Sequence, residues 1–327
     1  MKTLKEIRAT LPVYPLELDK PDIGRWQAGN AGVDYVHHFD SGVPGPHVMI
    51  NALTHGNEVC GAIAVDAFLR AAVRPVRGRL SFSFANVAAY DQFDPTDPDG
   101  TRYIDQDMNR VWSADVLDGP LDSVELRRAR DLRPIIDDVD YLLDIHSMHE
   151  KAAPLILTGP LDKAITFASK VDAPAHLMID AGHSAGTRLR DYGGFGDPAS
   201  AKNALLVECG QHFERASRDV ALDTASRFMV ATGVVDRQTV EPWLLAGEKL
   251  RPMSIRVTDA VVAESMAFRF DDDYLGMEVI AKAGSRIATD GEREILTPYD
   301  DCVIMQPSLR HLGKGVTVVR LGQLVER

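Results

Sequence analysis

The stretch Val48-Met49-Ile50-Asn51-Ala52-Leu53-Thr54-His55-Gly56-Asn57-Glu58 is an apolar run followed by a histidine, a turn and a glutamate. A short apolar run bounded by turn residues is typical of a buried strand. A helical pattern follows over 61–73. The stretch therefore predicts a strand, a turn and a helix, with two potential metal ligands, His55 and Glu58, placed where the strand ends.

Two later apolar runs end in the same way, because 141–145 leads into His146 and 204–207 leads into Glu208. The carboxyl ends of buried parallel strands meet at one edge of a sheet, where ligands gather. Two histidines and a glutamate can bind zinc with one position left open, and a further acidic group can act as a base. The sequence therefore predicts a zinc hydrolase.

Each of these residues also has a purely structural interpretation, as a satisfied core histidine or a carboxylate at a helix start. His149 competes with His146, but an offset of three places the two on opposite sides of an extended strand. We favour His146 because it directly follows the apolar run. Asp144 lies on the same side as His146, so it is either a hydrogen-bond partner of a ligand imidazole or an ordinary strand-end acid.

The composition is that of an ordinary globular protein, with 327 residues, 45% hydrophobic and 26% charged. A net charge of −12 argues against a nucleic-acid surface. No apolar run approaches the roughly 20 residues of a membrane span, and the first residues lack the apolar stretch of a signal peptide. The three cysteines, Cys60, Cys209 and Cys302, are too scattered for a disulfide framework. We expect reduced thiols, a cytoplasmic location and no membrane partner.

Strand and helix patterns alternate between residues 47 and 236, which predicts an α/β fold with a mostly parallel mixed sheet flanked by helices. The expected strands are 47–53, 80–90, 141–146, 154–158, 176–180 and 204–208, and the expected helices are 61–73, 122–137, 161–171 and 217–233. Short β-like runs separated by turns follow at 254–262, 266–270, 277–283, 302–306 and 315–325. We therefore expect a catalytic domain over 1–239, with an irregular entry over 1–45, and a small all-β domain over 240–327.

The segment 100–112, which contains Arg102, Asn109 and Arg110, follows an expected strand and should lie at the same edge of the sheet. Arginine binds carboxylates through two parallel hydrogen bonds, and an asparagine amide adds a neutral donor. The alternative is a solvated loop whose arginines pair with Asp105 and Asp107, in surface ion pairs worth about 0–1 kcal/mol each. Composition alone favours that alternative.

Five motifs taken together resemble the aspartoacylase/succinylglutamate desuccinylase family, which is related to the zinc carboxypeptidases. The motifs are Thr54-His55-Gly56-Asn57-Glu58, Thr101-Arg102-Tyr103-Ile104-Asp105, Asp107-Met108-Asn109-Arg110, Asp144-Ile145-His146 and Val207-Glu208-Cys209-Gly210. They follow the family's order, and the β-rich tail is similar to the family's C-terminal domain. The resemblance implies a zinc carboxypeptidase-like fold and a hydrolase of linear amide bonds.

The resemblance also implies a role for each matching residue. It makes His55, Glu58 and His146 the ligands of one Zn²⁺ per chain, Glu208 the general base, Arg102 the group that stabilises the oxyanion, and Asn109, Arg110 and Arg188 the substrate-binding residues. Arg188 matches least closely, because a Gly-rich stretch over 189–203 separates it from Glu208. Leu53 stands where many members have glycine, and Met108 replaces a usual leucine.

The function that the resemblance implies is hydrolysis of a small anionic N-acyl amino acid. A metallocarboxypeptidase acting on small peptides, or a metabolite-binding relative without catalysis, are the alternatives. Cys209 could be a nucleophile, although a buried thiol is the simpler interpretation, and Tyr299 is either a pocket residue or a turn residue. The sequence leaves a homo-oligomer open.

Overall fold

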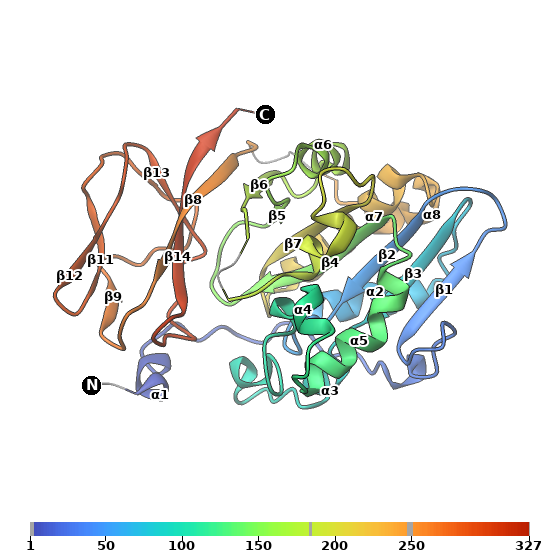
Figure 1. Ribbon diagram of the computed structural model, residues 1–327, viewed down its shortest axis with the longest axis horizontal. Coiled ribbons are helices and arrows are strands. Elements are labelled where there is room, and N and C mark those ends of the chain that lie inside the picture. The colour runs from blue at the N-terminus through green and yellow to red at the C-terminus, as the bar shows by residue number, and fades with distance from the viewer. Residues whose placement is uncertain (1–2, 183–184, 247–250, 327) are drawn as a thin grey trace.

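The computed structural model describes residues 3–182, 185–246 and 251–326, and a mixed eleven-stranded sheet runs through most of the molecule (Figure 1). The strand order in this sheet is β1 (Val36–Asp40), β3 (Arg79–Phe84), β2 (His47–Ala52), β4 (Tyr141–Met148), β7 (Asn203–Gln211), β5 (Leu155–Leu157), β6 (His176–Ile179), β8 (Ser254–Val262), β14 (Thr317–Val325), β13 (Cys302–Met305) and β10 (Val279–Ile280).

The strands that carry the candidate site residues are parallel neighbours. β2 pairs in parallel with β3 and β4, and β4 pairs in parallel with β7. In this register Asn51 lies opposite Ser83 and Asp144, and His146 lies opposite Glu208. The carboxyl ends of β2, β4 and β7 therefore meet at one edge of the sheet, as the sequence predicts.

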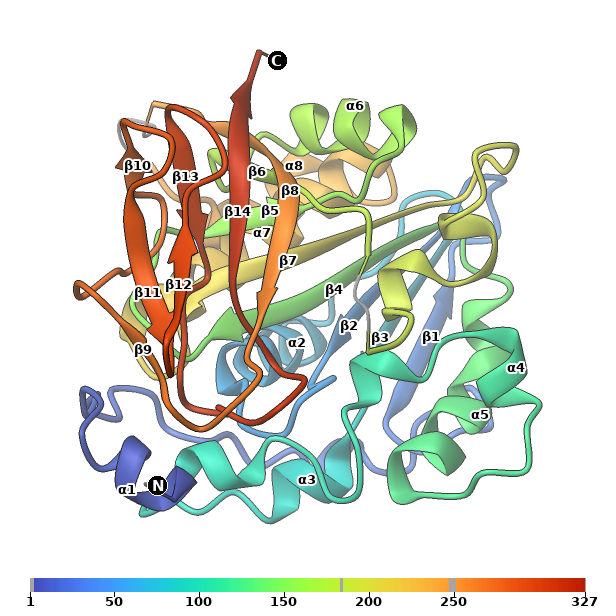
Figure 2. The ribbon, with the colours of Figure 1, turned by 60° about the vertical axis from the view of Figure 1, so that its left-hand side comes forward.

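Helices cover both faces of this part of the sheet. Successive side chains of a buried strand point to opposite faces, so each strand contributes apolar residues to the clusters on both sides. Val48 and Ile50 belong to the apolar cluster beneath α2 (Val59–Arg70), α6 (Asp162–Val171) and α7 (Arg215–Thr232). Met49 belongs to the cluster on the other face, beneath α4 (Ala114–Leu117) and α5 (Val124–Ile136). Figure 2 shows α2 and α5 on opposite sides of the sheet. The predicted α/β architecture is confirmed.

The C-terminal part is all-β, as predicted, and it is joined to the main sheet. β8 pairs in parallel with β6, and β14, β13 and β10 continue the sheet with antiparallel pairing (Figure 2). A second, three-stranded antiparallel sheet contains β9 (Phe268–Phe270), β11 (Arg286–Asp290) and β12 (Arg293–Leu296). The β11–β12 hairpin was not expected from the sequence. The domain boundary at residue 240 remains a prediction.

The expected strand over 80–90 is wrong in its second half. β3 ends at Phe84, and the short helix α3 (Val87–Asp91) begins after Asn86. The Asn86 side chain accepts a hydrogen bond from the Ala89 N–H, so it caps the helix that replaces the strand. The remaining short helical segments are α1 (Leu4–Arg8), α8 (Arg237–Val240), and 3₁₀ turns at Gly24–Trp26, Pro98–Thr101, Met108–Arg110, Leu189–Asp191, Gly193–Phe195 and Glu241–Trp243.

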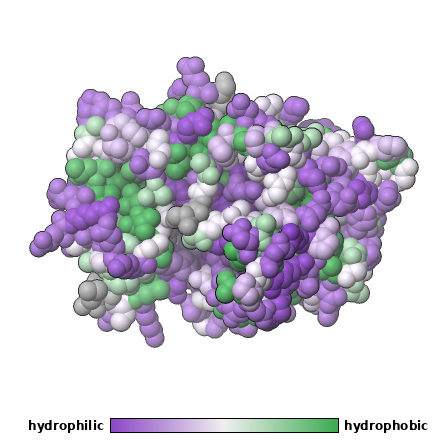
Figure 3. Space-filling view, in the orientation of Figure 1, coloured by the Kyte–Doolittle hydropathy of each residue, from purple (hydrophilic) through white to green (hydrophobic). Residues whose placement is uncertain are grey.

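Polar side chains cover most of the face shown in Figure 3, and apolar ones gather over the C-terminal strands on the left. Large apolar residues exposed in that part of the chain include Leu275, Val279 and Leu296. None of the described helices is long and apolar enough to cross a membrane. The cytoplasmic location and the oligomeric state remain predictions.

Candidate active site

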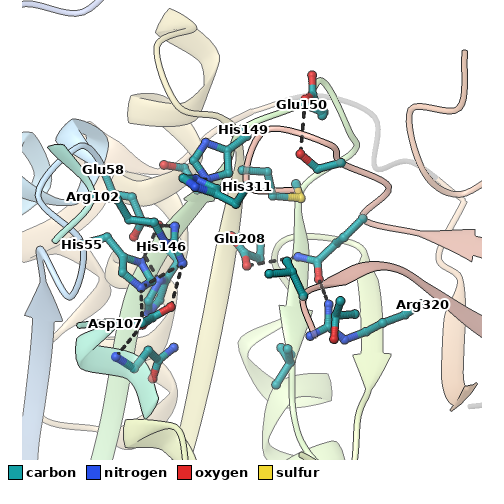
Figure 4. Close-up of a pocket in the computed structure, with 18 of the residues that line it drawn as sticks. His55, Glu58, Arg102, Asp107, His146, His149, Glu150, Glu208, His311 and Arg320 are labelled. Atoms are coloured by element: carbon teal, nitrogen blue, oxygen red, sulfur yellow. Dashed lines mark hydrogen bonds and ion pairs between the residues drawn. The ribbon is translucent and has the colours of Figure 1, made fainter. Parts of the chain in front are cut away.

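Three buried side chains, His55, Glu58 and His146, converge at the carboxyl edge of the sheet (Figure 4). Glu58 lies between the two imidazoles, with Oε1 2.8 Å from Nδ1 of His55 and Oε2 3.0 Å from Nδ1 of His146. The Oε2 atom is buried and, in this geometry, forms no hydrogen bond. One ligand atom from each residue lies within 4.8 Å of the others, so the set can hold a metal ion.

The outward nitrogens of both imidazoles are held by carboxylates. Asp144 Oδ2 lies 2.7 Å from Nε2 of His146, and Asp107 Oδ1 lies 2.9 Å from Nε2 of His55. When Nε2–H of His146 donates to Asp144, Nδ1 of that ring keeps its lone pair free for a metal, an arrangement common at metal-binding histidines. Nε2 of His55 lies 2.9 Å from both Asp107 Oδ1 and Arg102 Nη2. Asp144 is fully buried and accepts further hydrogen bonds from Asn51 and Thr54.

The structure places His149 apart from this set. His149 follows the end of β4 and contacts His212 and His311. Cys209 is 1% exposed and belongs to the apolar core, so it does not reach the site. Tyr299 hydrogen-bonds Thr258 and packs in the C-terminal core, away from the residues that line the cavity.

Glu208 comes from β7 and faces the same cavity. Its Oε1 accepts a hydrogen bond of 3.1 Å from Gln306 Nε2, and its Oε2 is buried without a hydrogen-bond partner among the described residues. Burial raises the pKa of Glu208 to about 7. A carboxyl group with a pKa near neutrality can both accept and release a proton at physiological pH.

Arg102 lies beside the ligand set because the loop that carries it approaches the β2–α2 turn. The Gly56 N–H donates to the Arg102 carbonyl at 2.9 Å. A Cβ at Gly56 would stand 2.6 Å from the Thr101 carbonyl oxygen, so only glycine permits this close approach of the loop. The Arg102 guanidinium lies 3.5 Å from Glu58 Oε1, within reach of a group bound at the metal set.

The arginine loop is organised by Glu125, a fully buried residue of α5. Its carboxylate accepts hydrogen bonds from three successive backbone N–H groups, those of Ile104, Asp105 and Gln106. Asp105 in turn accepts a hydrogen bond from the Val124 N–H at the start of α5. The backbone of the loop is therefore held against α5. Arg102 and Arg110 do pair with Asp107, at 3.5 and 3.8 Å, as the solvated-loop interpretation expects.

Asn109, Arg110 and Arg188 line one end of the cavity together with Arg320 from β14. Asn109 Oδ1 accepts a hydrogen bond from the Leu189 N–H, which ties the two segments together. Arg188 and Arg320 share Asp180 as their counter-ion, at 2.6 and 3.2 Å. The structure thus brings Arg188, the least certain sequence match, to the site.

Three residues that line the cavity were missed from the sequence, namely Gln306, Arg320 and His311. All lie in or after the ends of strands outside the predicted motifs, and no local pattern marks them. The complete cavity holds about 390 Å³ and is lined from both the α/β part and the C-terminal strands.

The fold and the site define a class: an α/β protein with a metal-ligand set and an acidic residue at the carboxyl edge of its sheet. A family model described as the succinylglutamate desuccinylase/aspartoacylase catalytic domain matches residues 44–231. The chain therefore belongs to this family, whose members are named as deacylating hydrolases.

Solved structures share the fold over most of their length. Succinylglutamate desuccinylase from Vibrio cholerae is 18% identical, with a TM-score of 0.65 over 89% of this chain and 86% of that one. Its counterpart from Chromobacterium violaceum is 15% identical, with a TM-score of 0.65 over 90% of both chains. The product-bound ectoine utilization protein EutE from Ruegeria pomeroyi is 16% identical, with a TM-score of 0.59 over 85% of both chains. A comparison with curated proteins gives no match.

Proposed function

We propose that this protein is a zinc-dependent amidohydrolase that cleaves the amide bond of an N-acyl amino acid. The observation that carries the proposal is the placement of Glu208 opposite His146 in the register of β4 and β7, facing the cavity that His55 and Glu58 also line. The family to which the chain belongs supports amide hydrolysis as the reaction.

The residues of the ligand set fit Zn²⁺. Imidazole nitrogen and carboxylate oxygen are ligands that zinc accepts, and three protein ligands leave a position open, as in catalytic zinc sites. The buried Oε2 of Glu58 lies 3.0 Å from Nδ1 of His146 without hydrogen-bond geometry, so a cation bound between them would satisfy this acceptor. A Zn²⁺ ion held there supplies Lewis acidity, which makes a water molecule more acidic and polarises a carbonyl group.

The chain's own residues perform the remaining steps. Glu208 accepts a proton from the attacking water and releases it to the departing amine nitrogen. The Arg102 guanidinium stabilises the negative charge that develops on the amide oxygen. Asn109 and Arg110 hold the substrate carboxylate, which fixes the amide close to Glu208.

The test is the variant Glu208→Gln, which removes the proton acceptor and keeps the side-chain shape. We expect hydrolysis of N-acetyl, N-formyl and N-succinyl amino acids to fall by about 10²–10⁴ in kcat, with zinc content unchanged by metal analysis. Glu292→Gln, on an exposed glutamate of the β11–β12 turn, is the matched control and should retain full activity. Normal turnover by Glu208→Gln would remove Glu208 from its assigned role.

A further inference from the structure

The two ends of the cavity differ in charge. In Figure 4, Asp107 and Arg320 lie on one side of Glu208, and His149, His311 and Glu150 lie on the other. The described arginines that line the cavity are Arg102, beside the ligand set, and Arg110, Arg188 and Arg320. Of these, Arg102 acts electrostatically on His149 and His311, and its guanidinium is paired with Glu58 and Asp107.

The end of the cavity lined by Arg110, Arg188 and Arg320, called here the arginine end, has N–H groups without an acceptor. Arg188 is 3% exposed, and its Nη1 atom has no hydrogen-bond partner among the described residues. Arg110, Arg188 and Arg320 have two nearby carboxylates, Asp107 and Asp180. The excess positive charge and the unpaired donor suit a carboxylate, as the proposed function requires.

Behind the histidine end, which His149 and His311 line, the Arg310 guanidinium is largely engaged by protein acceptors. Arg310 donates from Nε to Glu150 Oε1 at 2.8 Å, from Nη1 to Asp99 Oδ2 at 2.9 Å, and from Nη2 to the Pro12 carbonyl. With a second bond from Nη2 to Glu150 Oε2, four of its five N–H groups have protein acceptors. Arg310 is not among the described residues that line the cavity.

The hydrogen bonds of His149 and His311 show which ring nitrogen carries the proton when each ring is neutral. Arg8 can only donate, so the His311 Nδ1 that it contacts at 3.2 Å is an acceptor, and the His311 proton sits on Nε2. That proton is donated to Nε2 of His149 at 3.1 Å, so the His149 proton sits on Nδ1, facing Asp99 and His212 at 3.1 Å each. Every ring nitrogen of His149 and His311 is thus engaged within the protein.

Burial favours the same neutral state. It lowers the pKa of His149 well below its usual value, and it lowers the pKa of His212 and of His311 to about 3. The rings of His149 and His311, which line the cavity, therefore present it with uncharged carbon edges and faces. Met148 and Ala152, close to His149 in the chain, also line the cavity, as do Leu275 and Pro307. Glu150 and Ser308, which hydrogen-bond each other, line it too, so the charge nearest this end is negative.

We infer that the histidine end receives the acyl group, and that the enzyme selects N-acyl amino acids whose acyl group is uncharged. The inference rests on the proposed function, in which the arginine end holds the amino-acid carboxylate. A dicarboxylic acyl group such as succinyl would have to lose its water at this end beside the Glu150 carboxylate and without an unpaired cationic partner, which disfavours its binding.

The decisive comparison uses two compounds that differ in one charge: an N-succinyl amino acid and its methyl ester at the distal carboxyl group. Amine release by the zinc-loaded wild-type enzyme measures amide cleavage of both. We expect kcat/KM to be at least about tenfold higher for the ester, because an unpaired charge is costly to bury. Equal or better cleavage of the free succinyl compound would overturn the inference.

A binding measurement separates this inference from the proposed function. The same two compounds are titrated calorimetrically into zinc-loaded Glu208→Gln protein, where the ester should again bind at least about tenfold more tightly. If wild-type enzyme cleaves no N-acyl amino acid, the proposed function fails, whereas the binding ratio still decides the charge preference.

The variant Leu275→Arg places a cation at the histidine end, on a side chain that is 48% exposed and so tolerates the change. We expect this variant to shift the ratio of kcat/KM values toward the free succinyl compound by about tenfold. An unchanged ratio, in a variant that melts at the wild-type temperature, would show that the acyl group does not bind at this end.

Discussion

At the scale of single residues, the site depends on a row of polar side chains that crosses three strands beneath the ligand set. Ser83, Asn51 and Asp144 are register partners on β3, β2 and β4, and they are joined by hydrogen bonds of 2.5 Å and 2.7 Å. The row ends on the imidazole of His146. It therefore fixes the orientation of that ring from within the sheet.

The first prediction concerns Asp144. Asp144→Ala should weaken zinc binding by about 10–100-fold, because His146 loses the acceptor that orients its ring. Asp144→Asn retains an acceptor oxygen and should lose less. Competition with a chromogenic chelator measures both affinities, and an Asp144→Ala protein with wild-type zinc affinity would contradict the assigned role.

The second prediction concerns Arg102, which lies 3.5 Å from Glu58 and is placed to contact the substrate carbonyl. Arg102→Ala should lower kcat by about 10²–10³ while zinc content stays the same, because the donor acts on charge that develops during the reaction. Steady-state kinetics with metal analysis tests this. A change confined to KM would instead assign Arg102 to ground-state binding.

The ligand residues were predictable because each follows an apolar run, and topology brings the ends of such runs together. Leu53 and Glu125 show the limit of that reasoning. Leu53 adopts φ of +61°, a conformation that normally favours glycine, and its apolar side chain gave no sign of it. Glu125 has the position of an ordinary acid in the first turn of a helix, yet it binds the arginine loop.

At the scale of elements, α5 supports catalysis without contributing a residue to the cavity. Its Ser123 caps the helix by accepting the Leu126 N–H, and its Glu125 holds the backbone of the loop that carries Arg102. Sequence pattern located the helix within two residues at each end but could not assign this partner, because the contact joins segments about 20 residues apart.

The third prediction follows from that contact. Glu125→Gln replaces a charged acceptor of three backbone N–H groups with an amide that has one acceptor oxygen, so one or more donors lose their partner. We expect a stability loss of about 1–3 kcal/mol and a lower kcat. Asp122→Asn, on an exposed residue just before the same helix, should leave both quantities unchanged. Unaltered kcat in Glu125→Gln would show that the loop holds its shape by itself.

At the scale of the whole molecule, the histidine cluster joins four distant parts of the chain. Arg8 comes from the N-terminal helix, His149 and His212 follow β4 and β7, and His311 lies between β13 and β14. The sequence predicts strands over 302–306 and 315–325 but says nothing of their neighbours. These strands reach the site because β8 pairs with β6, and no local sequence pattern predicts that pairing.

The fourth prediction is a pH dependence of stability. Because folding lowers the pKa of His212 from about 6.5 to about 3, the unfolded chain binds the proton more readily between these values. Stability is therefore full above pH 6.5 and decreases as the pH falls toward 3, by about 1.4 kcal/mol per pH unit for one such group.

Denaturant unfolding at pH 7, 6 and 5 measures this slope. His212→Gln removes the titrating group, so the variant should lose less stability than the wild-type protein over the same range. Identical slopes in the two proteins would show that His212 is protonated equally well in the folded and unfolded chains.

The shared sheet has a practical consequence. A chain shortened to residues 44–231, the region that the family model covers, would retain every candidate metal ligand and Glu208. It would lack Gln306, Arg320 and His311, and β6 would be left with an unpaired edge. Swapping C-terminal segments between relatives should therefore exchange substrate preference and leave the chemistry in place.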